Sequence, residues 1–374
     1  MSAQHTSSTA RAAVIYEHNG PFVLEEFELE APRAGEVRVR IVATGMCHTD
    51  AAVRCGDLPT PLPVVLGHEG AGVVEAVGAG VRKVAPGDHV VISVNSCGQC
   101  DSCLSGHPSI CRHIFPLNFA GARLDGSHAL HSSHGLVNDQ FFGQSSFATR
   151  ALAHERNVVK VSTEVPLELL GPLACGIQTG AGSVLNGLRV GPGESFAVFG
   201  SGAVGLSAVM AARVGGATTI IAVDVLPSRL ALAQELGATH VINGREQDAV
   251  AAIQSITGIG VKHALDTTGN VSVIRGAIEA LRMGGVCGIL GASAPGAELS
   301  FPVSPFMSMS KSLRGIIEGD SVPDIFIPQL IELYRQGRFP FDKLVRFYAF
   351  EDINQALHDS EKGITVKPVI RMPA

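Results

Sequence analysis

A chain of 374 residues exceeds the size at which a single hydrophobic core keeps growing, so we expect two domains. A hydrophobic content of 46% and a charged content of 17% are typical of a folded globular protein and exclude a disordered one. The formal net charge of -6 argues against nucleic acid as a partner, and the lack of a long apolar run argues against a membrane-spanning segment.

The N-terminal stretch is polar and has neither the charged region nor the apolar region of a secretory signal. We therefore expect a cytoplasmic protein. In that compartment the eight cysteines stay reduced and serve as metal ligands or core residues instead of forming disulfides.

The chain opens with stretches that alternate between apolar and polar residues. Residues 12–16 and 36–43 are predicted to be strands, with Pro32 and Gly35 marking the turn between them. A strand that ends near Ala43 would present Cys47 from the loop just beyond its end, where ligands are commonly held.

Three soft metal ligands are spread over the first half of the chain. Cys47 is followed 21 residues later by His68, which stands in a Gly-His-Glu stretch, and Cys175 lies further downstream. Two thiolates and one imidazole hold zinc in three positions and leave the fourth open for water or substrate, so the set predicts a catalytic zinc site. Taken singly, Cys47 would more often be a core cysteine than a ligand, and His68 would more often be a hydrogen-bonded loop histidine than a ligand.

Two acidic residues stand close to these ligands. Glu69 could provide a carboxylate behind the metal, and Asp50 could accept the spare imidazole proton of His68 and so fix its tautomer. Both could instead be surface charges.

A second cysteine group has two, two and seven residues between its members and is predicted to close a tetrahedral, structural zinc site. An iron-sulfur cluster also uses four cysteines, and a zinc ribbon that binds nucleic acid is a further alternative. The four cysteines are Cys97, Cys100, Cys103 and Cys111.

The segment 107–140 is polar and carries histidines at 107, 113, 128, 131 and 134. Their irregular spacing favours a long surface loop that borders the active site or a subunit contact over a further metal site. Strand-like patterning resumes at 157–161.

A glycine-rich turn follows the apolar run 195–199 and precedes a predicted helix over 206–214. The turn reads Gly200-Ser201-Gly202-Ala203-Val204-Gly205. Asp224 ends the next strand, 19 residues after the last glycine, and this context predicts a dinucleotide site. Asp224 would bind the ribose hydroxyls and repel a 2′-phosphate, which favours NAD over NADP, although Arg229 lies close to it in the sequence.

Further buried strands are predicted at 240–242, 263–266 and 285–290, as a doubly wound parallel sheet requires. Helices are predicted over 325–335 and from 350, and a final strand over 365–371. We expect a catalytic domain over 1–185 with a metal lobe at 97–111, a nucleotide-binding domain over 186–320, and a return to the catalytic domain over 321–374.

The Gly-His-Glu stretch, the four-cysteine lobe and the glycine-rich turn together resemble the zinc-dependent medium-chain alcohol dehydrogenases, over essentially the whole chain. The stretches 139–149 and 170–180 are similar to bacterial aryl (benzyl) alcohol dehydrogenases. The resemblance implies an α/β fold class, with a Rossmann-type doubly wound domain and a mostly β, GroES-like catalytic domain.

The resemblance also implies residue roles. Cys47, His68 and Cys175 would bind the catalytic zinc, with Glu69 behind it. Thr49 would take the alcohol proton, and the cofactor would contact His48, Thr179 and Arg371 as well as the glycine-rich turn, Asp224 and Arg229. Where many members carry a histidine that passes the proton onward, this chain has Ala52.

The implied activity is oxidation of a primary aromatic alcohol to its aldehyde, reversibly, with hydride transfer to NAD. Two zinc ions per chain, a small-molecule substrate and a homodimer or homotetramer belong to the same expectation. An allylic terpene alcohol such as geraniol, or the adduct used by glutathione-dependent formaldehyde dehydrogenases, is an alternative substrate. A scaffold that binds NAD and zinc without turnover is the alternative outside enzymes.

Overall fold

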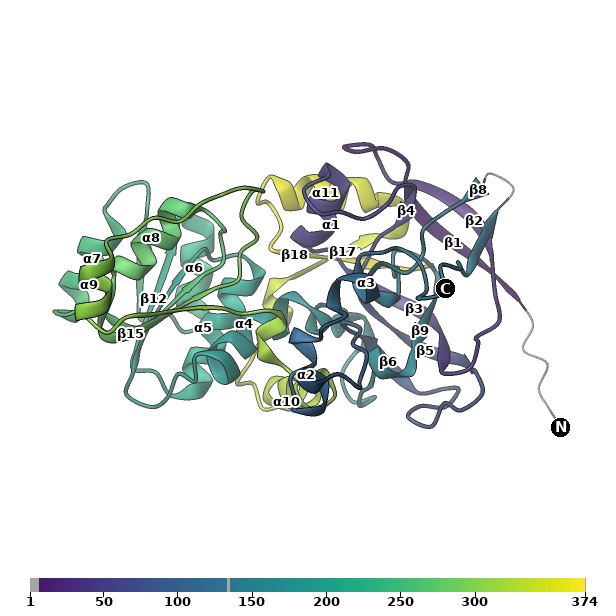
Figure 1. Cartoon of the computed structure of the whole chain (residues 1–374), viewed down its shortest axis with the longest axis horizontal. Coiled ribbons are helices and arrows are strands. Elements are labelled where there is room, and N and C mark those ends of the chain that lie inside the picture. Colours follow the sequence, from purple (N-terminus) through teal and green to yellow (C-terminus); the bar gives the residue numbers. More distant parts are fainter. Residues whose placement is uncertain (1–6, 133–134, 374) are drawn as a thin grey trace. The chain divides into compact units, whose positions relative to one another are not determined.

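The fold is taken from a computed structural model, which describes residues 7–132 and 135–373 (Figure 1). Contacts divide the described chain into two compact units. The first unit holds the chain up to Cys175, Val322–Glu332 and the chain from Asp342 onward, and the second unit holds Gly176–Ser321 and Leu333–Phe341. The first junction between the units lies after Cys175, whereas the sequence predicted it between residues 185 and 186. The difference arises because α4 (Gly176–Gly182), the helix that follows Cys175, packs on α5 (Ala203–Gly215) of the second unit.

One sheet of the first unit has the strand order β4-β1-β2-β7-β8, with antiparallel neighbours. Its strands are β1 (Ser8–Ile15), β2 (Val23–Leu29), β4 (Val64–Val65), β7 (Leu130–Ser132) and β8 (Gly135–Leu136). The segment 107–140, expected as an irregular loop, thus contributes two short strands, because β7 finds a partner in β2.

The other sheet of the first unit has the order β10-β6-β5-β3-β18-β17, and β9 also pairs with β3. Its strands are β3 (Glu36–Gly45), β5 (Glu69–Val77), β6 (His89–Ile92), β9 (Arg150–His154), β10 (Val158–Lys160), β17 (Val345–Ala349) and β18 (Lys367–Arg371). The C-terminal strand β18 runs antiparallel to β3, so the last strand of the chain joins a sheet built mostly from residues 36–160. This confirms the expected mostly β unit.

The central strand β3 forms because apolar and charged residues alternate along it. In β3 the side chains of Val37, Val39 and Ile41 are buried in the core, while the charged residues between them are only partly buried. The helices that begin in the first unit are short, except α10. They are α1 (His48–Cys55), α2 (Asp101–Leu104), α3 (Ile114–Asn118), α10 (Pro323–Arg335) and α11 (Ile353–Glu361).

The second unit is built on a parallel sheet of order β13-β12-β11-β14-β15-β16, which confirms the doubly wound prediction. Its strands are β11 (Ser195–Phe199), β12 (Thr219–Asp224), β13 (His240–Asn243), β14 (Val261–Asp266), β15 (Leu281–Ile289) and β16 (Ser312–Gly315). Its helices are α4 (Gly176–Gly182), α5 (Ala203–Gly215), α6 (Pro227–Leu236), α7 (Ala249–Thr257), α8 (Val271–Glu279) and α9 (Val303–Ser308).

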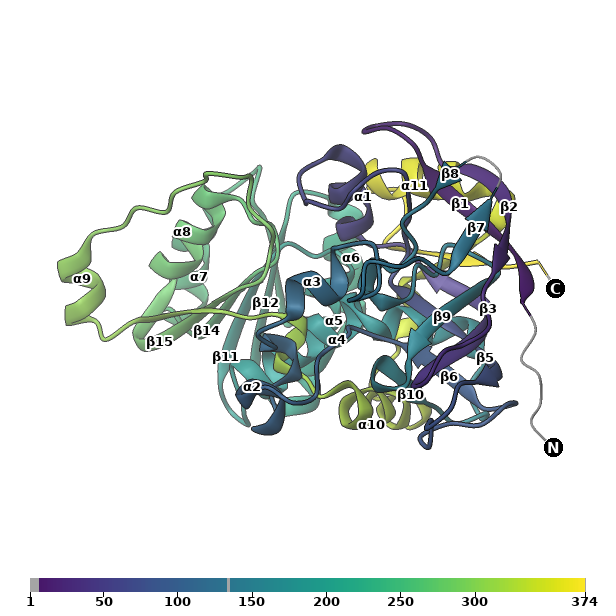
Figure 2. The same cartoon turned by 45° about the vertical axis from the view of Figure 1, so that its right-hand side comes forward.

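Helices cover both faces of this sheet (Figure 2). Helices α5 and α6 pack on each other and on β12, whereas α7 and α8 pack on each other and on β14. Both faces are therefore apolar, and β11, β12 and β14 are buried along most of their length.

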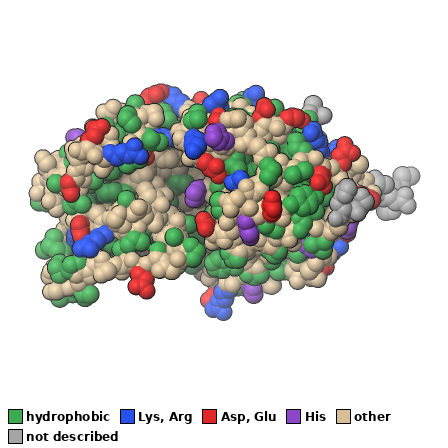
Figure 3. Space-filling model, turned by 90° about the horizontal axis from the view of Figure 1, so that it is seen from above, with side chains coloured by type: hydrophobic (Ala, Val, Ile, Leu, Met, Phe, Trp, Pro, Cys, Tyr) green, Lys and Arg blue, Asp and Glu red, His purple; other side chains and the backbone are tan. Residues whose placement is uncertain are grey.

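Within the described residues, each helix is too short or too polar to cross a bilayer. On the face shown in Figure 3, acidic and basic side chains are interspersed with apolar ones. This mixture agrees with the small net charge of the chain.

Candidate functional site

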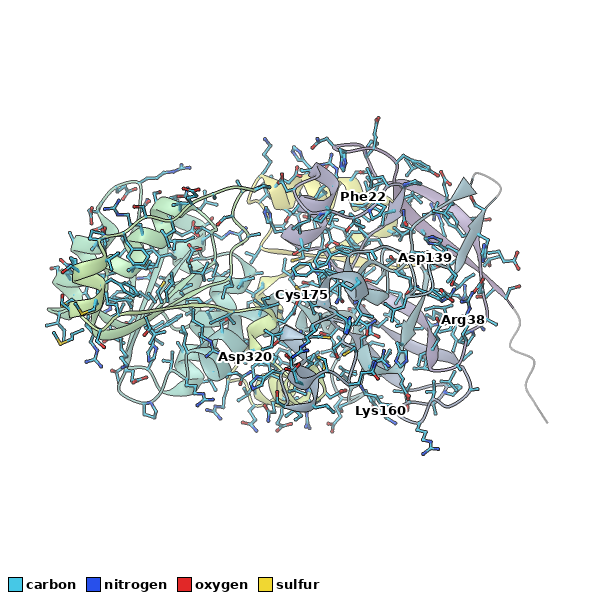
Figure 4. The ribbon with its side chains drawn as sticks, viewed as in Figure 1. Phe22, Arg38, Asp139, Lys160, Cys175 and Asp320 are labelled. Atoms are coloured by element: carbon cyan, nitrogen blue, oxygen red, sulfur yellow. The ribbon has the colours of Figure 1, made fainter. Side chains whose placement is uncertain are left out.

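Four side chains that can bind a metal come together in the first unit: Cys47, His68, Glu69 and Cys175. Their ligand atoms all lie within 4.8 Å of one another. Cys47 follows the end of β3, His68 immediately precedes β5, and Cys175, labelled in Figure 4, follows the 3-10 turn Gly171–Ala174. Strands and turns far apart in the sequence thus bring together the three ligands that the sequence singled out.

His68 is oriented by Asp50, and both side chains are fully buried. Nδ1 of His68 lies 3.0 Å from Oδ1 of Asp50, so the imidazole keeps its proton on Nδ1. The Asp50 carboxylate also accepts hydrogen bonds from the backbone N–H groups of Cys47 and Gly67. The surface-charge alternative is therefore wrong for Asp50.

Nε2 of His68 is buried and has no hydrogen-bond partner among the described residues. Leaving this nitrogen unpaired in the interior costs on the order of 1–3 kcal/mol, and with the other proton on Nδ1 it offers a lone pair to a metal once it releases its own proton. A zinc ion held by Cys47, His68 and Cys175 would satisfy it, so the donor set fits the metal.

The electrostatics of the cluster favour a thiolate at Cys47 next to a positively charged His68. Hydrogen bonding with Cys175 lowers the pKa of Cys47 well below its usual value, against the effect of burial and with help from the charge of Lys367. Burial lowers the pKa of His68, but the Asp50 carboxylate and Cys47 raise it by more. The net result is a pKa well above the usual value. Without a metal these groups therefore favour a proton on Nε2 of His68, and a zinc ion bound there would replace that proton and be stabilised by the same thiolate.

Glu69 forms a buried ion pair with Lys367, which lies on β18. Nζ of Lys367 lies 2.6 Å from Oε1 of Glu69 and also donates to the carbonyl oxygen of Met46 at 3.1 Å. Burial raises the pKa of Glu69 to about 7, although the positive charge of Lys367 opposes this rise. The surface-charge alternative is wrong for Glu69 too, since its side chain is fully buried.

Lys367 is the residue of this site that sequence reasoning missed. Its one signal is a single lysine inside an apolar C-terminal strand, and its partner lies 298 residues away in the chain. Gly45 makes room for the pair, because a Cβ atom there would collide with Oε2 of Glu69.

The segment after Gln140 forms a wall against His68. The ring of Phe142 stacks on the imidazole with centroids 4.5 Å apart, and Phe141 meets it edge-on at 5.5 Å. Gln144 donates to the carbonyl oxygen of His68 and accepts from the N–H of Gly70. The imidazole ring of His68 is thus fixed by the two phenylalanine rings, and its main chain is fixed by the side chain of Gln144.

The four cysteines of the lobe also lie together, and their sulfur atoms fall within 4.8 Å of one another. The Sγ atom of Cys100 lies 3.5 Å from that of Cys103 and 3.9 Å from that of Cys111. Four sulfurs at 2.3 Å from a central ion would be separated by about 3.8 Å, so the space fits one zinc ion better than a cluster of several irons.

Backbone N–H groups point at these sulfurs. The N–H of Cys100 donates to Sγ of Cys97, and the N–H of His113 donates to Sγ of Cys111, each at 3.3 Å. Hydrogen bonds from the backbone lower the pKa of Cys100 to about 6. Cys97 and Cys100 therefore favour the thiolate form that zinc requires, whereas burial raises the pKa of Cys103 to about 12 and also raises that of Cys111.

The histidines of the segment 107–140 form no comparable group. Within the described ranges, the two ligand groups above are the ones that could hold a metal ion, and neither includes these histidines. His131 instead lies 2.9 Å from a Glu30 carboxylate oxygen. His134 lies outside the described residues.

The glycine-rich turn in the second unit joins β11 to α5. Gly205 packs so closely on Gly200 that a Cβ atom would collide with the carbonyl oxygen of Gly200. Asp224 ends β12, and its carboxylate accepts hydrogen bonds from the backbone N–H groups of Ser201, Val225 and Leu226. The acid is thus held against the turn, as a dinucleotide site requires.

A cavity of about 540 Å³ adjoins this turn, and Gly200, Asp224 and Thr268 are among the residues that line it. Arg229 is buried on α6, where burial lowers its pKa and the Asp224 carboxylate raises it. Arginine and acid therefore interact within the second unit.

The remaining predicted residues fall in several places. His48 and Thr49 open α1, and Oγ1 of Thr49 lies 3.7 Å from Sγ of Cys47. Ala52 is buried on the same helix. Thr179 lies on α4 in the second unit.

Arg371 lies at the exposed end of β18. Its guanidinium group pairs with Glu168 at 2.8 Å and lies over the ring of Phe347 at 3.7 Å. Its predicted contact with cofactor phosphates stays a prediction.

Two protein families match the chain. The family described as alcohol dehydrogenase GroES-like domain matches residues 33–163, and the family described as zinc-binding dehydrogenase matches residues 203–335.

Relatives and solved structures match over nearly the full length. A geraniol dehydrogenase of Castellaniella defragrans is 50% identical over 364 residues, which are 97% of each chain. The crystal structure of a benzyl alcohol dehydrogenase from Acinetobacter calcoaceticus is 51% identical with a TM-score of 0.96, and the match covers 98% of this chain and 100% of that chain. An alcohol dehydrogenase zinc-binding domain protein from Burkholderia ambifaria is 57% identical with a TM-score of 0.97, and the coverage is again 98% and 100%.

Proposed function

Since the chain belongs to the zinc-dependent medium-chain alcohol dehydrogenases, we propose that it oxidises a primary aromatic alcohol of the benzyl type to its aldehyde. The reaction is reversible and transfers a hydride to NAD. The observation that carries the proposal is the cluster of partly buried Cys47 with buried His68 and Cys175, in which Nε2 of His68 has no hydrogen-bond partner among the described residues.

The proposal assigns two zinc ions to each chain. Cys47, His68 and Cys175 would hold the catalytic ion and leave one position open to substrate, whereas the four cysteines of the lobe would enclose a structural ion. Asp224 supports NAD over NADP, because its carboxylate would face a 2′-phosphate with like charge.

When bound, zinc supplies a Lewis acid that lowers the pKa of the substrate hydroxyl, and NAD supplies the hydride acceptor. The chain itself handles the proton and the geometry. Thr49 would accept the proton of the substrate hydroxyl, and its place beside Cys47 puts it next to the cluster. Asp50 keeps the lone pair of His68 on Nε2, and Lys367 balances the charge of Glu69 behind the cluster.

The proton path beyond Thr49 differs from the pattern of many family members. Ala52 has no group that could pass a proton on. A proton acceptor beyond Thr49 would therefore have to come from outside this chain, and a cofactor ribose hydroxyl and water would supply that chemistry when bound. The roles of His48, Thr179 and Arg371 at the cofactor, a homodimer or homotetramer, and a cytoplasmic location also stay predictions.

Geraniol is the second candidate substrate, because a relative with 50% identity is a geraniol dehydrogenase. The benzyl alcohol proposal is supported by the crystal structure at 51% identity. Rates of NAD reduction by the zinc-loaded protein with benzyl alcohol, geraniol, ethanol and S-hydroxymethylglutathione separate the candidates. We expect the highest kcat/KM with benzyl alcohol. A higher kcat/KM with geraniol or with the glutathione adduct would make that compound the proposed substrate in place of benzyl alcohol. No turnover of any of the four compounds, despite bound zinc and NAD, would favour a scaffold without enzymatic activity.

A further inference from the structure

The first unit contains a second cavity, of about 300 Å³, which none of Cys47, His68 and Cys175 lines. One part of its lining is apolar and includes Pro116 and Leu117. Another part is polar and includes Asn95, Gln140, His154 and Arg156. Nothing in the proposed dehydrogenase reaction uses these four polar side chains.

Most charges in the lining neutralise one another. Arg123 pairs with Glu36 at 2.6 Å, and Arg33 pairs with Asp125 at 3.1 Å. These four charges therefore attract no further ligand strongly.

Arg156 differs, because within the described part of the chain its guanidinium group has no carboxylate partner. Its Nε donates to the carbonyl oxygen of Ser96 at 2.9 Å, and its Nη1 lies 3.0 Å from Nε2 of His154. Arg156 thus leaves one positive charge of the cavity lining uncompensated.

The contact between His154 and Arg156 lacks an acceptor. Nδ1 of His154 faces the backbone N–H of Arg156 at 3.2 Å, and Nε2 faces the guanidinium N–H. A neutral imidazole carries a proton on one of its two nitrogens, so at least one of these contacts sets one donor against another. Burial, followed by the charge of Arg156, lowers the pKa of His154, so the ring is neutral near pH 7.

Two amide side chains complete the polar part of the cavity. Asn95 is only 7% exposed, and its Oδ1 has no hydrogen-bond partner among the described residues. Gly143, which also lines the cavity, lies so close to Asn95 that a Cβ atom there would approach Nδ2 to 2.8 Å. The NH2 group of Asn95 thus lies beside Gly143 at the cavity, and Gln140 adds a second amide NH2 group to the lining. These two groups are the amide donors available to a ligand, whereas Oδ1 of Asn95 would need a donor that a carboxylate does not supply.

We propose that this cavity is a binding site for a small organic carboxylate. Its carboxylate would accept hydrogen bonds from Arg156, from the ring N–H of His154 and from the amide groups of Asn95 and Gln140. Its apolar body would lie against Pro116 and Leu117. A carboxylate supplies the acceptor that His154 and Arg156 lack and balances the uncompensated charge. A neutral amide of the same shape could offer its carbonyl oxygen as an acceptor but would leave the charge of Arg156 uncompensated.

Calorimetric titration of the zinc-loaded, full-length protein tests the site, with benzoate as the probe. Benzamide, a neutral ligand of the same shape, and sulfate, an inorganic oxyanion, are the comparison ligands. The variants are Arg156→Gln, Gln140→Leu and Ala122→Phe, of which the last places a ring in the cavity. Arg11→Gln is the matched control, because Arg11 pairs with Glu351 and does not line the cavity.

We expect saturable benzoate binding that Arg156→Gln weakens about tenfold or more, since hydrogen bonds to charged groups have this strength. Gln140→Leu and Ala122→Phe should weaken it as well, whereas Arg11→Gln should not. Benzamide should bind at least about tenfold more weakly than benzoate. Zinc content and the thermal midpoint identify a cavity variant that is misfolded. If one is misfolded, benzoate binding by the other two cavity variants tests the proposal.

Three results would overturn the proposal. The first is no detectable benzoate binding to the wild-type protein. The second is benzoate binding that survives all three cavity variants, which would place the ligand elsewhere, for example at the metal cluster. The third is sulfate binding as tight as benzoate binding, which would contradict the assignment to an organic carboxylate.

Discussion

Replacing Lys367 by methionine tests the ion pair behind the zinc cluster. The change removes the positive charge that lies 2.6 Å from Glu69 and leaves a fully buried carboxylate, whose pKa burial already raises to about 7. Removing one partner of a buried pair costs roughly 3–5 kcal/mol. For a domain of this size, that loss corresponds to a fall in Tm of about 6–20 °C.

Thermal unfolding followed by circular dichroism measures this change. Lys160→Met is the matched control, because Lys160 pairs with Asp88 at 2.7 Å but is 58% exposed, so its loss should cost less than about 1 kcal/mol. Glu69→Gln in the Lys367→Met background should recover much of the lost Tm, since no uncompensated charge then remains buried. Equal falls in Tm for Lys367→Met and Lys160→Met would show that the buried pair of Lys367 and Glu69 contributes no more to stability than an exposed pair.

Three further predictions concern the lobe, the cofactor and pH. Cys100→Ser should remove one zinc ion per chain and lower Tm while the ligands at Cys47 remain, and zinc analysis showing unchanged metal content would contradict the structural site. Asp224→Ala should weaken NAD binding far more than NADP binding, and an unchanged ratio of the two Kd values would count against the ribose contact. Burial lowers the pKa of His263, so the unfolded chain takes up its proton first and Tm should fall as pH drops from 7 to 5.5. His263→Gln should flatten this part of the pH profile, and an equally steep profile in the variant would show that another group is responsible.

The sequence predicted well those features whose residues lie close together along the chain. The glycine-rich turn and Asp224 stand within 25 residues of each other, and each follows a buried strand whose apolar run is visible in the sequence. The four cysteines of the lobe likewise fall within one short segment. Spacing alone could therefore place them near one another.

The features that the sequence did not reveal depend on pairing between distant segments. Lys367 meets Glu69 only because β18 pairs with β3, and β3 pairs with β5, which begins at Glu69. Phe142 and Gln144 reach His68 through a turn in which Phe142 adopts a φ of 52°, and no local pattern announces that turn. The same limit applies to the domain junction after Cys175, which depends on how α4 packs.

The central claim is that Cys47, His68 and Cys175 hold a zinc ion that carries out alcohol oxidation. The most direct test measures zinc content and NAD reduction by benzyl alcohol in parallel, for the wild-type protein and for Cys47→Ser. We predict that the variant binds one zinc ion fewer per chain and loses nearly all turnover, while the thiolate lobe keeps its own ion. Turnover that stays intact in a variant with unchanged zinc content would show that Cys47 is not a ligand of a catalytic zinc ion.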